Sequence, residues 1–169
     1  VVMRQVKDSV TQAQMLESGA ADVAMQVDAD TAANLADNDE VVVESIPSFN
    51  FVYVAIGAGA GGLPVEMTRD VREAIALAID YEGAIEFIVA GQGRPQAAPI
   101  PNGFPGTAGL EPTECDVERS RELLAAAGHA DGFTLEAVYP SVNVYGVDFN
   151  LMMQKIQQDL SDVGVELDL

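Results

Sequence analysis

Residues 69–101, RDVREAIALAIDYEGAIEFIVAGQGRPQAAPIP, constrain the fold more than any other stretch of the chain. Apolar residues recur there at three- and four-residue spacing from Val71 to Ile79, which places them on one face of a helix. Asp80 interrupts this pattern and can cap a second, shorter helix that ends near Gly91. A loop rich in glycine and proline follows. The stretch therefore predicts two consecutive helices packed on a core, and then a long connection.

Apolar patterns along the rest of the chain alternate between strand-like and helix-like segments. β-branched runs and two-residue alternation predict strands at residues 1–6, 21–27, 41–43, 49–56, 133–139 and 165–169. Capping residues and helical spacing predict helices from Asp8 or Ser9 to Gly19, from Asp28 or Asp30 to Leu35, from Asp116 to Gly128, and from Phe149 to Gly164. The strongest strand signal is 49–56, FNFVYVAI, because it is apolar on both faces, as in an interior strand. The order of elements predicts the α/β class, with helices packed on a mixed sheet.

The chain is strongly acidic. It carries 27 Asp and Glu residues against 8 Lys and Arg, a formal net charge of −19 at pH 7, and no Lys or Arg lies between Lys7 and Arg69. Phosphate backbones and anionic membrane surfaces would be repelled, so we expect no nucleic-acid partner. We interpret the acidic run as a solvated surface, with a cation-binding cleft as the alternative. With 49% hydrophobic residues, 169 residues are enough for one domain with its own core.

Several classes of site and segment have no support in the sequence. Cys115 is the only cysteine, which excludes an internal disulfide, and His129 is the only histidine. A catalytic Cys–His pair would still need an orienting group, so we predict no catalytic residues, no metal site and no cofactor. No run of about 18 apolar residues predicts a membrane span, and no signal peptide is recognisable. Both ends read as strands, so we expect the chain to be part of a larger protein.

Gly57–Gly62 reads GAGAGG and matches the dinucleotide-binding spacing G-x-G-x-x-G after a predicted strand. That fingerprint needs its last glycine beside the start of a helix, whose free N–H groups hold the pyrophosphate. Here Pro64 intervenes, and the next helix is expected only near Thr68. We therefore interpret the segment as a flexible loop. A nucleotide-binding enzyme domain that uses Gly57–Gly62 is kept as the alternative function.

Four segments resemble motifs of the family 5 extracellular solute-binding proteins, the dipeptide, oligopeptide and nickel receptors of bacterial ABC importers. In chain order they are MLESGAADVAMQV (15–27), RDVREAIALAIDYEGAIEFIVAGQGRPQAAPIPNGFPG (69–106), DVERSRELLAAAGHADGFTLEAVYPS (116–141) and FNLMMQKIQQDLSDVGVELDL (149–169). Each motif alone is unspecific. Together, in this order, they cover most of the chain.

The resemblance implies one lobe of a type II periplasmic-binding-protein-like fold. Residues 1–169 would form a single lobe, the second of a two-lobed protein that closes on its ligand about a hinge. The implied function is the ligand-binding lobe of an ABC transporter substrate-binding protein, which captures a peptide or another small solute and performs no reaction. The implied partners are that solute, the ABC permease subunits and the missing first lobe, and the implied location is the periplasm.

Two departures from the family pattern bear on the ligand. An Asn that the family usually carries after the strand matching 51–56 would fall near Gly57, so its role has no counterpart here. Peptide receptors of the family commonly place a basic residue in the loop that matches Ser141–Gly146, where it holds a ligand carboxylate. This chain has no Lys or Arg in that loop. The resemblance therefore does not support a peptide carboxylate clamp at this position.

Ligands of open α/β sheets lie outside the carboxyl ends of the strands. Two places meet this rule, after the segments 21–27 and 133–139. The six residues there are Gln26, Asp28, Tyr139, Ser141, Asn143 and Tyr145. Tyrosine and amide side chains suit a binding pocket because they combine apolar area with hydrogen-bonding groups. For Asp28, helix capping explains the residue at least as well as ligand contact. We expect most of the six to share one concave face.

Overall fold

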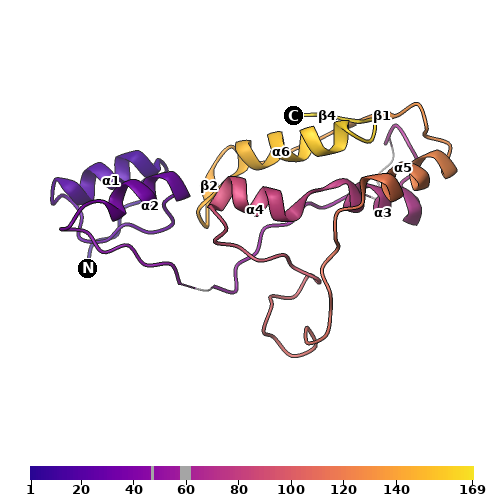
Figure 1. The fold of residues 1–169 in the computed structure, drawn as a ribbon. Helices are drawn as coiled ribbons and strands as arrows, with labels where there is room; N and C mark the ends of the chain where they lie inside the picture. The colour runs from indigo at the N-terminus through magenta and orange to yellow at the C-terminus, as the bar shows by residue number, and fades with distance from the viewer. Residues whose placement is uncertain (47, 58–61) are drawn as a thin grey trace.

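The computed structural model describes residues 1–46, 48–57 and 62–169, and Figure 1 shows their path from the N-terminus to the C-terminus. The helices are α1 (Ser9–Glu17), α2 (Ala29–Ala36), α3 (Arg69–Ala78), α4 (Tyr81–Val89), α5 (Val117–Ala126) and α6 (Phe149–Ser161). The strands are β1 (Phe133–Glu136), β2 (Asn143–Val144), β3 (Val147–Asp148) and β4 (Val165–Asp168). The predicted α/β class is confirmed, with the strands in one parallel pair and one antiparallel pair.

Short polar side chains start all of these helices. Each capping oxygen accepts a backbone N–H of the first turn, which has no partner inside the helix. The caps are Asp8, Asp28, Thr68, Asp80, Asp116 and Asp148. A cap of this kind contributes about 1 kcal/mol to stability. The predicted caps Asp80 and Asp116 are therefore confirmed, and part of the acidic composition is explained by helix starts.

The main core lies where α3, α5, α6 and β4 meet. The predicted apolar stripe of α3 is confirmed, because Val71, Ala74, Ile75 and Ala78 are all buried. Leu124 of α5 and Val165 of β4 complete the contact from the other side and are among the most buried side chains. Burying one large aliphatic side chain contributes about 1.5–3 kcal/mol. The helix with the clearest apolar stripe in the sequence, α3, is therefore packed in the main core with α5 and α6.

β1 and β4 pair in parallel, with Phe133 opposite Val165 and Leu135 opposite Leu167. Two parallel neighbours need a crossover connection, and α6 provides it. In Figure 1, α6 lies along this pair, close to the C-terminus. β1 ends at Glu136, before the predicted end of this strand at residue 139. The polar segment 141–146 was expected to be a loop, yet it contains β2 and the turn into β3.

Four predicted strands are absent from the described chain: 1–6, 21–27, 41–43 and 49–56. These predictions are wrong because a strand needs a neighbour for its backbone hydrogen bonds, and no described segment pairs with these four. Within 49–56, Tyr53 is 73% exposed, whereas Ile56 packs against the main core. The apolar pattern therefore reports a preference for the extended backbone, but the pairing that defines a strand is not formed.

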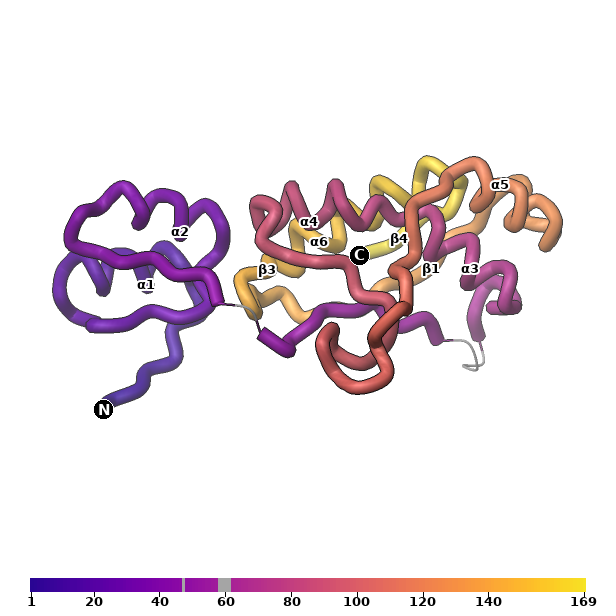
Figure 2. The backbone as a smooth tube through the Cα atoms, turned by 60° about the horizontal axis from the view of Figure 1, so that its bottom comes forward, coloured from indigo at the N-terminus to yellow at the C-terminus, as the bar shows by residue number. Residues whose placement is uncertain are grey.

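α1 and α2 pack against each other at the N-terminal end of the molecule. Both views show them beside the β2–β3 hairpin and apart from α3 and α5 (Figures 1 and 2). Leu35 and Thr31 of α2 are buried there, outside the main core. The hairpin turn that faces them has positive φ at both central residues, 58° at Tyr145 and 78° at Gly146. Such a two-residue turn matches the twist of an antiparallel pair.

The connection from α4 to α5 is irregular, as predicted, and forms a loop that projects away from the helices in Figure 1. Phe104 of this connection meets Phe49 edge to face, with ring centroids 4.9 Å apart. The aromatic contact holds the connection against the segment that leads from α2 towards α3. Among the helices that the structure describes, none combines the length and hydrophobicity that a membrane crossing requires.

Candidate functional site

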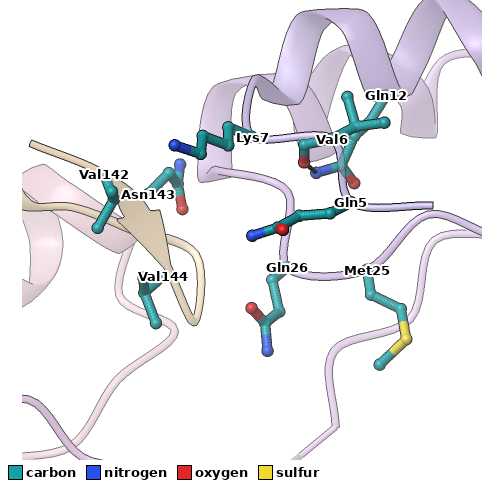
Figure 3. Close-up of a pocket in the computed structure, with 9 residues that line it drawn as sticks. All are labelled: Gln5, Val6, Lys7, Gln12, Met25, Gln26, Val142, Asn143 and Val144. Atoms are coloured by element: carbon teal, nitrogen blue, oxygen red, sulfur yellow. Dashed lines mark hydrogen bonds between the residues drawn. The ribbon is translucent and has the colours of Figure 1, made fainter. Parts of the chain in front are cut away.

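Two adjoining hollows lie between the α1–α2 pair and the β2–β3 hairpin. The first, which we call the amide hollow, measures about 230 Å³ and is drawn in Figure 3. Its lining residues are Gln5, Val6, Lys7, Gln12, Met25, Gln26, Val142, Asn143 and Val144. The second, which we call the acidic hollow, measures about 240 Å³. Its lining residues are Lys7, Asp8, Ser9, Asp28, Ser141, Val142, Asn143, Asp148 and Asn150.

The structure brings together four of the residues predicted to face a ligand. Gln26 lines the amide hollow, Asp28 and Ser141 line the acidic hollow, and Asn143 lines both. Tyr139 and Tyr145 line neither: Tyr139 packs against the main core, and Tyr145 lies 46% exposed in the hairpin turn. The expected common concave face therefore includes the amide, carboxylate and hydroxyl side chains but excludes the two tyrosines. Their roles in ligand binding stay predictions.

Ser9 connects the segments around the two hollows. It is only 4% exposed, and its hydroxyl oxygen accepts the backbone N–H of Asp28 at 3.2 Å. The same oxygen lies 3.5 Å from the side-chain nitrogen of Asn143, which donates to it. The hairpin also approaches the segment before α2 closely, since a Cβ atom on Gly146 would lie 3.3 Å from the carbonyl oxygen of Val27. These contacts set the position of the hairpin relative to the α1–α2 pair.

The backbone at Gln26, in the lining of the amide hollow, has an uncommon conformation. This residue has a φ of 62°, which is unusual for a residue that carries a side chain. Figure 3 shows the carboxamides of Gln5 and Gln26 pointing into the space before β2. The carboxamide of Gln12, in contrast, donates to the carbonyl oxygen of Val6 at 2.9 Å and holds that segment on α1. The hollow therefore presents amide groups on a fixed backbone.

Three carboxylates of the acidic hollow are also helix caps. Burial raises the pKa of Asp28, but hydrogen bonds from Thr31 and Ser9 outweigh it and hold the pKa below its usual value. Hydrogen bonds from Thr11 lower the pKa of the Asp8 carboxyl in the same way. Both groups are therefore charged at neutral pH, beside the third cap, Asp148. Within residues 1–46, 48–57 and 62–169, no group of three or more His, Cys, Asp or Glu side chains is placed to hold a metal.

Lys7 is one of the residues lining the hollows that the sequence prediction did not name. It lines both hollows, and in Figure 3 its side chain extends towards Asn143 of β2. It directly follows the predicted strand 1–6, but only the ends of the segments 21–27 and 133–139 were considered as ligand positions. One sequence signal could have drawn attention to it: Lys7 is the last basic residue before the acidic interval that ends at Arg69.

The glycine loop proposed for a nucleotide lies mostly outside the described residues, since 58–61 are not among them. The described part begins again at Gly62, and α3 starts only at Arg69, after Pro64. The helix start that should hold a pyrophosphate is therefore not adjacent to the last glycine. The alternative function as a nucleotide-binding domain is not supported.

Sequence comparison relates the chain to a group of bacterial binding proteins. The chain is 29% identical over 167 residues to the glutathione-binding protein GsiB of Pectobacterium atrosepticum, which covers 99% of the chain and 31% of that protein. It is 29% identical over 166 residues to GsiB of Salmonella typhimurium, which covers 98% of the chain and 31% of that protein. The chain thus spans about a third of the length of the curated relatives it matches.

Solved structures share the fold. The dipeptide-binding protein of Pseudoalteromonas sp. SM9913 in complex with Met-Leu superposes with a TM-score of 0.76 at 24% identity, over 95% of this chain and 32% of that one. The periplasmic binding protein DppA of Helicobacter pylori in complex with the peptide STSA gives a TM-score of 0.73 at 20% identity, over 98% of this chain and 31% of that one. The family model described as "Bacterial extracellular solute-binding proteins, family 5 Middle" matches residues 1–169. The chain therefore belongs to the family 5 bacterial extracellular solute-binding proteins.

Proposed function

We propose that the protein is the solute-binding component of an ABC importer, and that it captures a short peptide or a similar small solute. The match of the family model to residues 1–169 carries this proposal. The names of the relatives refer to glutathione, and the solved neighbours hold Met-Leu and the peptide STSA, so peptides are the first solute class to test. The protein binds its solute without transforming it.

The position of the hollows supports this function. They lie between the α1–α2 pair and the β2–β3 hairpin, and residues from both sides line them. A solute held there would contact segments that are far apart in the sequence, for example Gln26 and Asn143. We further propose, from the resemblance, that residues 1–169 form one lobe and that a second lobe completes the site by hinge closure.

The importer setting adds two further proposals. The protein acts outside the cytoplasm, in the periplasm, where it meets external solutes. It then delivers the solute to the ABC permease subunits. The strongly acidic surface, with a formal net charge of −19, is compatible with protein and small-molecule partners and unfavourable for nucleic acid.

A thermal-shift screen of the full-length protein, as its gene encodes it, tests the function. The solutes are Met-Leu, glutathione and NAD, the last as the probe for the nucleotide alternative. A peptide present at 100 times its Kd stabilises the folded protein by about 2.7 kcal/mol, so the melting temperature should rise by several degrees. We expect a rise with a peptide and none with NAD. A rise with NAD and with neither peptide would contradict the proposal.

Two variants locate the site. Asn143→Ala removes a side chain that lines both hollows, so we expect weaker peptide binding in calorimetry. Thr134→Ala is the control, because Thr134 is an exposed residue of β1 and lines neither hollow. Equal affinities for the two variants would place the site elsewhere on the protein.

A further inference from the structure

The amide hollow is unusual for this chain because no carboxylate lines it. The protein has 27 acidic residues and 8 basic ones, yet the polar lining of this hollow consists of one lysine and four carboxamides. Gln5 and Gln26 make no hydrogen bond with any residue that the structure describes, so their N–H groups are available to a ligand. A positive charge together with amide donors is a favourable surrounding for an anion.

The acidic hollow has the opposite character. Asp8, Asp28 and Asp148 line it, and they would repel an anion. The two hollows share Lys7, Val142 and Asn143, so Lys7 stands at the boundary between an acidic side and an amide side. An anionic group that approaches Lys7 is therefore directed to the amide side.

The ammonium group of Lys7 is exposed, and it has no ion-pair partner among the described residues. Within the described residues, four of the seven other basic side chains are ion-paired: Arg69 with Glu73, Arg119 with Glu122, Arg121 with Glu118, and Lys155 with Asp159. Lys7 therefore differs from them in presenting its charge beside a hollow. A lysine ammonium has three donors on a flexible stem and can follow a ligand group into place.

We propose that Lys7 holds an anionic group of the solute, a carboxylate, in the amide hollow, and that Gln5 and Gln26 donate further hydrogen bonds to it. The inference rests on the proposed function, because it names the chemistry that the same site selects. A carboxylate bound there gains charge-assisted hydrogen bonds, which are roughly twice as strong as neutral ones. Neutral analogues of the same solute lose that part of the affinity.

Calorimetry on the full-length protein tests this with Met-Leu and with its C-terminal amide, which lacks the carboxylate. Lys7→Gln should weaken Met-Leu binding by about 10- to 100-fold and leave the affinity for Met-Leu amide unchanged. Arg4→Gln is the matched control. It removes the same charge from the same exposed segment, and Arg4 lines neither hollow. An equal loss for both peptides, or an equal effect of Arg4→Gln, would overturn the proposal.

A second measurement does not depend on finding the right solute. Reductive methylation with ¹³C labels lysine side chains, and the signal of Lys7 is assigned by its loss in Lys7→Gln. Sodium acetate should shift this signal in a saturable way, and sodium chloride at equal ionic strength should not. No specific shift with acetate would overturn the inference. A shift without peptide binding would keep the inference and contradict peptide capture. Peptide binding that Lys7→Gln leaves unchanged would support peptide capture and contradict the role of Lys7.

Discussion

The hydroxyl of Ser120 donates a hydrogen bond to the carbonyl oxygen of Ala74 at 2.7 Å, deep between α5 and α3. Both residues have a relative exposure of 0%. Their small side chains let the two helices approach closely, and the hydrogen bond satisfies a hydroxyl that would be costly to bury alone. This contact fixes α5 on the helix whose apolar stripe dominates the sequence.

Ser120→Ala should lower the free energy of unfolding by about 1 kcal/mol, since it removes one buried hydrogen bond. Ser120→Val should cost about 1–3 kcal/mol more, because the added methyl groups must fit where no space remains. Urea unfolding of the purified variants measures both. Ser161→Ala is the control, since that hydroxyl bonds the carbonyl of Gln158 in an exposed position. A Ser120→Ala cost no larger than that of Ser161→Ala would contradict the argument.

Gly132 and Gly164 lie directly before the paired strands β1 and β4. Gly132 has a φ of 79°, and a Cβ atom on it would lie 2.1 Å from the carbonyl oxygen of Gly164. No side chain fits there without moving the backbone. The parallel pairing of Phe133 with Val165 begins one residue later. The two glycines therefore permit the close approach from which the strand pair starts.

Gly132→Ala is expected to destabilise the protein far more than Gly128→Ala. Both positions have positive φ, which costs about 1–2 kcal/mol for alanine. Only Gly132 adds a backbone clash, worth roughly 1–3 kcal/mol or more, because a Cβ on Gly128 meets no atom within 4 Å. Thermal unfolding monitored by circular dichroism compares the two. Similar melting temperatures would show that the strand pair can shift to make room.

The helices were predictable because their signals are local. A cap such as Asp80 and a stripe such as Val71 to Ala78 act within a few turns of the chain, and the structure confirms them. The strands β1 and β4 were predictable for a related reason, since they find each other across the single crossover α6. The segment 49–56 shows the limit. Its strand pattern is strong, but pairing is a property of two segments, and no described partner is present.

The candidate site shows the same limit at the level of side chains. Gln26 and Asn143 were expected near a ligand from their place after predicted strands, and the structure brings them to one hollow. Lys7 also follows a predicted strand, 1–6, but that strand is not formed, and the residue reaches the hollow through the packing of α1 beside the β2–β3 hairpin. Tyr139 was expected at the site but turns to the core, since the strand before it ends three residues early.

Lys155 joins α6 to the start of α4. Its ammonium lies 2.5 Å from one oxygen of Asp159 and 3.5 Å from Asp80, and the backbone N–H of Asp80 donates to the other oxygen of Asp159. Burial lowers the pKa of Lys155, but the hydrogen bond and charge of Asp159, with the charge of Asp80, outweigh it and raise the pKa above 10.5. The folded state therefore favours the charged lysine.

A raised pKa determines the sign of the pH dependence. The ion pair contributes its full stability below the unfolded pKa of 10.5 and loses it as the pH rises through the higher folded value. Lys155→Met should cost about 1–3 kcal/mol at pH 7, since the pair is only partly exposed. Above pH 10.5, the difference in the free energy of unfolding between wild type and Lys155→Met should become smaller. Urea unfolding of both proteins from pH 7 to above pH 10.5 measures this difference. A difference that stays constant with pH would exclude the raised pKa of Lys155.

Asp28 caps α2 and also lines the acidic hollow, and two substitutions can distinguish these roles. One of its oxygens accepts the backbone N–H of Thr31 at 2.8 Å, and the residue also lines the acidic hollow. Asp28→Ala should cost about 1 kcal/mol of stability by removing the cap, whereas Asp28→Asn keeps a capping oxygen and should lose only the contribution of the charge at neutral pH. Because the pKa of Asp28 is lowered, wild type should lose the contribution of its charge as the pH falls below 3.8, and Asp28→Asn should not.

The same two variants test the contact of Asp28 with the solute. A peptide ammonium beside the acidic hollow would donate a charge-assisted hydrogen bond to the carboxylate of Asp28. We therefore expect Asp28→Asn to weaken Met-Leu binding about 10-fold although it keeps the capping oxygen of α2. N-acetyl-Met-Leu, which has no ammonium, should bind wild type and Asp28→Asn equally, and calorimetry compares the two peptides. If Asp28→Asn binds Met-Leu like wild type and only Asp28→Ala is impaired, Asp28 acts as the cap of α2 alone.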